Sequence, residues 1–127
     1  SQVMTPRADI VAVPLNQPME KIITAVIQSG FSRVPVYAGS FENLKGILYS
    51  KDLLVAWRSG TLIVLEDLLR PVHVVEPDML ISDLLRIFRT GRHHLAVVRE
   101  KNGERIKGLI TIQDALEAIF GEIREEA

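Results

Sequence analysis

The chain has 127 residues, of which 47% are hydrophobic and 24% are charged, and its formal net charge is −1. This composition is typical of a folded protein, and the near-neutral charge argues against broad attraction to nucleic acid or anionic lipid. Because the chain contains no cysteine, a disulfide framework and a thiolate zinc site are excluded. It also has no signal-peptide pattern and no apolar run of the roughly 18 residues that cross a bilayer. Its abrupt ends suggest a part of a longer protein.

An internal repeat divides the chain into two copies. Shifting the sequence by 61 or 62 positions aligns Lys45–Leu54 (KGILYSKDLL) with Lys107–Leu116 (KGLITIQDAL). The repeat predicts a first unit at residues 1–61, and a second at 62–127 that includes a connecting turn. Units of this size cannot bury a sheet face alone, so we expect the copies to pack sheet to sheet as a pseudo-symmetric pair.

Each copy is predicted to follow the order β-α-β-β-α, which makes the fold class α/β (α+β). Pro18 suits the first turn of the first helix and Gly30 its exit. Trp57 is interpreted as a packing residue near the end of its helix. The predicted strands are residues 10–13, 33–37, 47–49, 72–75, 95–99 and 106–111, and the predicted helices 19–29, 51–58, 79–89 and 113–123, with a helical turn within 62–69.

The strand-to-helix junctions carry the candidate chemistry. Thr111 and Asp114 open the last predicted helix in the pattern T-x-x-D, which is close to a capping box. A helix N-terminus also favours phosphate oxygens, and a carboxylate in the first turn suits the hydroxyls of a ribose. The residues alone leave both interpretations open. In the first copy Tyr49 aligns with Thr111, Ser50 follows one residue late, and Asp52 aligns with Asp114.

The duplicated unit, with G-h-h-T-x-x-D (h, apolar) at Gly108–Asp114, resembles a cystathionine-β-synthase (CBS) domain pair, or Bateman module. More narrowly, five strings in order are similar to the CorC/HlyC branch, which is implicated in magnesium and cobalt efflux. They are VMTPR from Val3, SRVPVY from Ser32, GILYSKDL from Gly46, RHHLAV from Arg92 and FGEI from Phe120.

The resemblance implies a regulatory module that binds an adenine nucleotide, AMP or ATP, with or without Mg²⁺. It assigns phosphate contacts to Thr111 and Arg33, and ribose hydroxyls to Asp114, while a solvated charge at the end of a strand remains the equal alternative for Arg33. It also places Thr5 beside the adenine and gives Val34 and Pro35 backbone roles around the base. A second, weaker site is expected at Ser50, Asp52 and His94, because the bulky Tyr49 stands where the second copy has Thr111.

The resemblance also implies a homodimer formed through the CBS faces, within a parent protein that carries a membrane or C-terminal accessory domain. Localisation in the cytoplasm is expected, at the cytosolic face of the inner membrane in the full-length protein. The alternative function is a structural dimerisation module without nucleotide. An enzyme is not expected, since the chain has no cysteine nucleophile, H-E-x-x-H or P-loop. A metal site is not expected either, because His93 and His94 are adjacent on a strand and point to opposite faces.

Overall fold

The computed structural model describes residues 4–60, 62–79, 81–90 and 95–126. They form two compact units, which we call the central unit, Val11–Val72, and the terminal unit, Ser1–Ile10 with His73–Ala127. These units divide the chain differently from the sequence repeat, because the N-terminal residues fold with the second copy.

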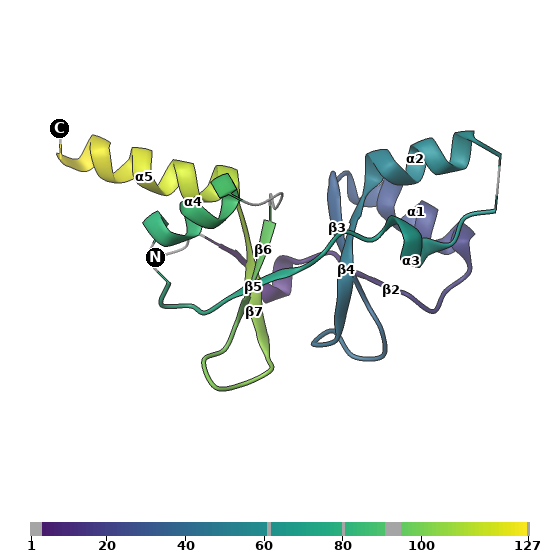
Figure 1. Cartoon of the computed structure of the whole chain (residues 1–127), viewed down its shortest axis with the longest axis horizontal. Coiled ribbons are helices and arrows are strands. Elements are labelled where there is room, and N and C mark those ends of the chain that lie inside the picture. Colours follow the sequence, from purple (N-terminus) through teal and green to yellow (C-terminus); the bar gives the residue numbers. More distant parts are fainter. Residues whose placement is uncertain (1–3, 61, 80, 91–94, 127) are drawn as a thin grey trace. The chain divides into compact units, whose positions relative to one another are not determined.

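The central unit is a three-stranded sheet with helices packed on one face (Figure 1). Two strands run parallel because a helix crosses between them, and the third returns antiparallel. Gly30 ends the first helix with a left-handed φ of 72°, as predicted. The elements are β2 (Val13–Pro14), α1 (Met19–Ser29), β3 (Arg33–Tyr37), β4 (Leu44–Tyr49), α2 (Ser50–Arg58) and α3 (Leu65–Leu68), and the strand order is β2-β3-β4.

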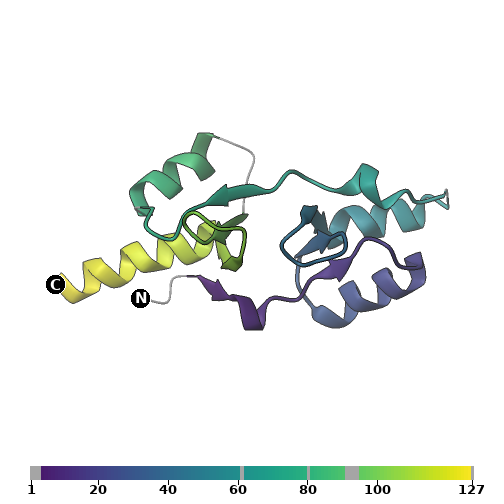
Figure 2. The same cartoon turned by 90° about the horizontal axis from the view of Figure 1, so that it is seen from below.

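The terminal unit repeats this plan, with its helices again on one face of the sheet (Figure 2). Its sheet gains a fourth strand from the start of the chain, in the order β1-β7-β6-β5. The elements are β1 (Thr5–Pro6), the 3₁₀ helix η1 (Arg7–Asp9), β5 (His73–Val75), α4 (Ile81–Thr90), β6 (Leu95–Arg99), β7 (Ile106–Thr111) and α5 (Ile112–Glu126).

The added strand β1 lies antiparallel to β7, with Thr5 opposite Leu109 and Pro6 opposite Gly108. Glycine is needed there, because a Cβ atom at Gly108 would meet the Thr5 carbonyl oxygen and, at 2.9 Å, the Met4 Sδ atom. The central unit has a shorter version of this contact, an isolated antiparallel bridge between Ile47 and Arg70. In the repeat Ile47 corresponds to Leu109, so Arg70 stands where the terminal unit has Thr5.

Most of the predicted elements are present, and the strands at 33–37, 95–99 and 106–111 have the predicted bounds. The strand predicted at residues 10–13 is instead Val13–Pro14, since a proline is tolerated on an edge strand. The interpretation of Trp57 as a packing residue was wrong, because its side chain is 58% exposed.

Each unit has its own hydrophobic core. In the central unit the core joins α1, the three strands and α2, and its buried residues include Ile22, Val26, Val36, Leu48 and Leu53. In the terminal unit it joins α4, the strands and α5, and includes Leu84, Phe88, Ala96, Ile110 and Ala115. The helix that follows the last strand of each unit is therefore anchored where its first turn begins.

Candidate functional site

The second junction, Thr111–Asp114, is where β7 passes directly into α5. The Asp114 amide donates a hydrogen bond to Thr111 Oγ1 at 3.1 Å. In return, the Thr111 amide donates to Asp114 Oδ2, also at 3.1 Å. The two bonds form a capping box, which satisfies two backbone donors at the start of the helix. The capping interpretation is therefore confirmed.

The cap leaves part of both side chains available for a ligand. Thr111 Oγ1 accepts the amide proton, and its own hydroxyl proton is left to donate. Asp114 uses Oδ2 for the cap, so Oδ1 is left to accept, and no described residue forms a salt bridge with this carboxylate. Both residues are half-buried. At the positive end of α5 the junction can donate to an anion and accept from hydroxyls.

Thr5 lies in the same unit as this junction. It is exposed on β1, the strand beside β7, opposite a residue two positions before Thr111. The structure thus places three predicted site residues, Thr5, Thr111 and Asp114, in the same unit and on neighbouring elements, although Thr5 is far from the other two in the sequence.

The first junction, Tyr49–Asp52, is built differently. Tyr49 takes the N-cap position of α2 and makes no side-chain cap hydrogen bond. The Asp52 carboxylate instead accepts two hydrogen bonds from Arg70, from Nε to Oδ2 at 3.0 Å and from Nη2 to Oδ1 at 3.2 Å. The Arg70 guanidinium carbon also lies 3.9 Å from the centre of the Tyr49 ring. Ser50 donates its amide to the Ser32 carbonyl oxygen at 2.9 Å.

The remaining predicted residues lie on β3 of the central unit. Arg33 pairs with Tyr49, its guanidinium carbon is 5.3 Å from the Tyr49 ring centre, and its buried Nε has no hydrogen-bond partner among the described residues. The side chains of Val34 and Pro35 are fully buried, which leaves only their backbone for the role that was predicted. His94 and its neighbour His93 lie outside the described residues.

Arg70 is the functional candidate that the sequence reasoning missed. A signal was present, since Arg70-Pro71 occupies in one copy the place of Thr5-Pro6 in the other. The alignment shows the difference between arginine and threonine, but it does not show that the arginine side chain reaches Asp52.

The described residues contain neither a metal-binding cluster nor a membrane-spanning helix. No group of three or more His, Asp or Glu side chains is arranged to hold a metal ion in this part of the chain. Among the same residues, no helix is both long and apolar enough to span a membrane.

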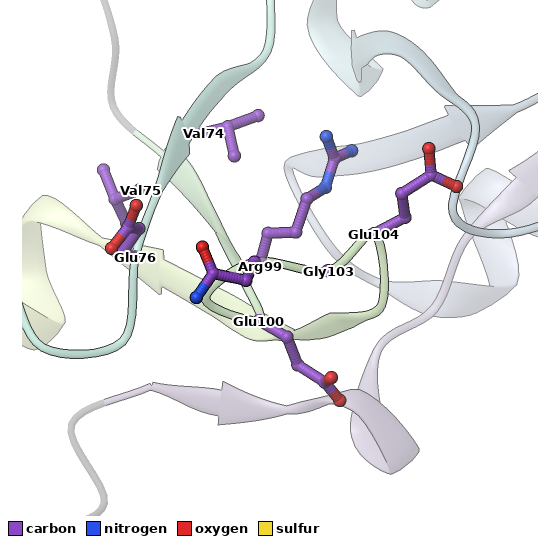
Figure 3. A pocket seen from close by; sticks show the side chains of 8 residues that line it. Val74, Val75, Glu76, Arg99, Glu100, Gly103 and Glu104 are labelled. Carbon is purple, nitrogen blue, oxygen red and sulfur yellow. The ribbon is translucent and has the colours of Figure 1, made fainter.

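The terminal unit also contains a pocket of about 450 Å³, whose lining side chains are shown in Figure 3. Its lining includes Val75, Glu76, Arg99 and Glu104, at the ends of β5 and β6 and on the hairpin before β7. The junction lies at the opposite end of β7, and the lining contains none of the predicted site residues.

Comparison with known proteins agrees with the duplicated fold. The family model for the CBS domain matches residues 1–59 and again residues 65–121. The chain therefore belongs to the CBS domain family, as a tandem pair of CBS domains.

The relatives place the chain in the CorC branch of the CBS domain proteins, as the sequence predicted. The chain is 35% identical, over 125 residues, to the magnesium and cobalt efflux protein CorC of Escherichia coli (strain K12). That alignment covers 98% of this chain but 42% of the relative, so the chain spans less than half the length of the curated relative.

Two solved structures share the fold at similar identity. A CBS domain protein from Shewanella oneidensis MR-1 has a TM-score of 0.87 and is 35% identical, covering 94% of this chain and 95% of that one. The CBS domain of a bacterial CNNM/CorC family Mg²⁺ transporter, in complex with ATP, has a TM-score of 0.84 and is 31% identical. That match covers 94% of this chain and 85% of the transporter domain.

Proposed function

We propose that the chain is a regulatory module that binds an adenine nucleotide, AMP or ATP, within a CorC-type magnesium and cobalt efflux protein. The observation that carries the proposal is the second junction, where the capping box at a helix N-terminus leaves a hydroxyl proton and a carboxylate oxygen without another partner among the described residues. The ATP complex of the related transporter domain supports the choice of ligand.

In the proposed site Asp114 accepts hydrogen bonds from the ribose hydroxyls and Thr111 donates to a phosphate oxygen. Thr5 lies beside the base. Arg33, Val34 and Pro35, which the family resemblance also assigned to the ligand, lie on β3 of the central unit. The first junction, with Ser50 and Asp52, is at most a weaker site, since Arg70 already binds the Asp52 carboxylate.

The module would act by binding rather than by chemistry. A nucleotide that prefers one conformation of the CBS pair shifts the pair towards it, and the change passes to the neighbouring domains of the longer protein. In that protein the module would lie at the cytosolic face of the inner membrane. When ATP is the bound nucleotide, Mg²⁺ accompanies it as a counter-ion to its phosphates.

Substitution of Asp114 tests the proposed site directly. Asp114→Ala removes charge-assisted hydrogen bonds, so calorimetry with ATP and with AMP should show affinity falling by about 10- to 100-fold. Asp114→Asn keeps an acceptor for the Thr111 amide while it removes the charge, so the helix cap survives and the affinity should still fall.

Asp52→Ala is the matched control, because Asp52 holds the same position in the other copy. We expect its nucleotide affinity to stay within about twofold of the wild-type value. If the wild-type chain binds neither nucleotide, or if both Asp114 variants bind as tightly as the wild type, the proposal is wrong.

A second candidate function, a structural homodimerisation module, is favoured by a different surface. In the central unit, α1 and α2 border an apolar groove of about 590 Å³, lined in part by Ile27, Phe31, Leu54 and Trp57. These four side chains are between 52% and 71% exposed. Leu116 on α5 corresponds to Leu54 in the repeat and is also exposed. Because both copies expose the same apolar helix face, we propose that a second copy of the chain covers it.

Light scattering after size-exclusion chromatography tests this interface. The double variant Leu54→Asp with Leu116→Asp places charges on both helix faces, so a dimer of the wild-type chain should become a monomer. Leu62→Asp is the control, because Leu62 is 92% exposed and lies outside both helices. A wild-type chain that is monomeric at high concentration, or a double variant that remains dimeric, would rule the interface out.

A further inference from the structure

We infer that Arg70 fills the first junction from within the chain and closes it to nucleotide, so that the module takes up a single nucleotide at the second junction. This inference rests on the proposed function and adds the residue that decides how many nucleotides bind. The two copies have the same backbone plan and different side chains at their junctions.

Backbone contacts hold Arg70 in place independently of its side chain. Its amide donates to the Ile47 carbonyl oxygen and its carbonyl oxygen accepts from the Ile47 amide, both at 2.9 Å. The approach requires Gly46, where a Cβ atom would meet Leu69 Cβ at 2.7 Å and the Arg70 carbonyl oxygen at 2.9 Å. These backbone contacts hold the Arg70 Cα atom beside β4. The guanidinium therefore reaches Asp52 through the choice of side-chain rotamer alone.

The guanidinium then uses both groups that a nucleotide would need at this junction. Its paired donors bind both carboxylate oxygens of Asp52, the bidentate geometry that suits arginine. It also stacks on Tyr49, which stands at the position of Thr111. To bind Asp52, the ribose hydroxyls would have to displace these contacts. The junction also has no threonine hydroxyl at the cap.

The terminal unit has a threonine where the central unit has Arg70. Thr5 stands at the position of Arg70, and a threonine side chain is short and carries no charge to offer Asp114. No described residue forms a salt bridge with Asp114 in that unit. The same exchange of threonine for arginine thus separates an open junction from a closed one.

The effect of Arg70 on binding should be moderate, because the ion pair is partly exposed, with 45% of the Arg70 side chain and 26% of the Asp52 side chain accessible. An exposed bidentate pair with a stacking contact corresponds to about tenfold in affinity for a competing ligand, or about 1.4 kcal/mol. Removal of the positive charge of Arg70 would by itself weaken the binding of a phosphate ligand nearby. A gain in ATP affinity would therefore show that Arg70 had blocked the first junction.

Calorimetry with ATP on four proteins tests the inference: the wild type, Asp114→Ala, and each of these with Arg70→Thr added. We expect the wild type to bind a single ATP per chain and Asp114→Ala to bind weakly. Adding Arg70→Thr to Asp114→Ala should tighten ATP binding by about tenfold. Arg58→Thr, the same substitution at an exposed arginine at the end of α2, should give no gain in either background.

Two results would overturn the inference: uptake of two equivalent ATP molecules by the wild type, or equal ATP affinity of Asp114→Ala with and without Arg70→Thr. A wild type that binds no ATP contradicts the proposed function instead. In that case Arg70→Thr alone decides the inference, because ATP binding that appears in this variant supports closure by Arg70 and its absence refutes it. Thermal melting of each variant confirms that it is folded.

Discussion

At the scale of single residues, the two copies differ at their junctions more than their sequences suggest. Thr111 and Asp114 bind each other, whereas their counterparts Tyr49 and Asp52 both bind Arg70. The sequence predicted Thr111 and Asp114 as a pair because i and i+3 positions at a helix start meet locally. It did not predict the Arg70 contact, because that contact depends on where a later segment crosses the sheet edge.

Gly108 affects both the stability of the terminal unit and the position of Thr5, because it lets β1 pack closely against β7. Gly108→Ala places a Cβ atom against the Thr5 carbonyl oxygen and the Met4 side chain, so β1 must move away from β7. We expect a loss of about 1–3 kcal/mol in the free energy of unfolding, measured by urea denaturation, from overpacking. Gly121→Ala is the control, since no described atom lies within 4 Å of a Cβ atom built there and alanine favours the α5 helix. Equal stability of Gly108→Ala and the wild type would contradict the close packing of β1.

At the scale of elements, apolar periodicity indicates the buried face of a helix only in part. The apolar residues of α1 recur at helical spacing, which is typical of a buried face, and Ile22 and Val26 are buried with 1% and 3% exposure. The same apolar residue types gave no warning that Ile27 and Trp57 would be exposed, because periodicity shows which side of a helix is apolar but not how much of it the fold covers.

A pair of substitutions in α1 separates the covered face from the exposed one. Ile22→Ala should lower the free energy of unfolding by about 2–5 kcal/mol, because it leaves a cavity in the core of the central unit. Ile27→Ala, at 71% exposure, should change it by less than about 0.5 kcal/mol in dilute protein. Urea unfolding curves measure both, and equal losses at low concentration would contradict the assigned faces.

At the scale of the whole molecule, the chain is a CBS domain pair whose two units resemble each other in plan. Even the irregularity in pairing recurs, between Val36 and Tyr37 in one unit and between Val98 and Arg99 in the other. The plan is shared, and the proposed difference in function lies in the few side chains at each junction.

Nucleotide binding to the folded chain should raise its thermal stability. ATP at 100 times its dissociation constant should add about 2.7 kcal/mol to the free energy of unfolding, which shifts Tm by several degrees. Differential scanning fluorimetry measures the shift, with Asp114→Ala as the variant that should respond less, since a 10- to 100-fold weaker affinity leaves only about 0.4–1.4 kcal/mol at the same ATP concentration. A matching shift in that variant would show that ATP stabilises the chain from another site.

The sequence by itself determined the duplication, the order of strands and helices, and the residue types at the two junctions. These follow from local patterns, in which apolar spacing, glycine and proline positions, and T-x-x-D pairs act over a few residues. The tertiary structure decided that β1 completes the sheet of the second copy and that Arg70 binds Asp52. Both depend on a short segment that pairs with a sheet edge from far along the chain, and edge pairing of this kind leaves no local period in the sequence.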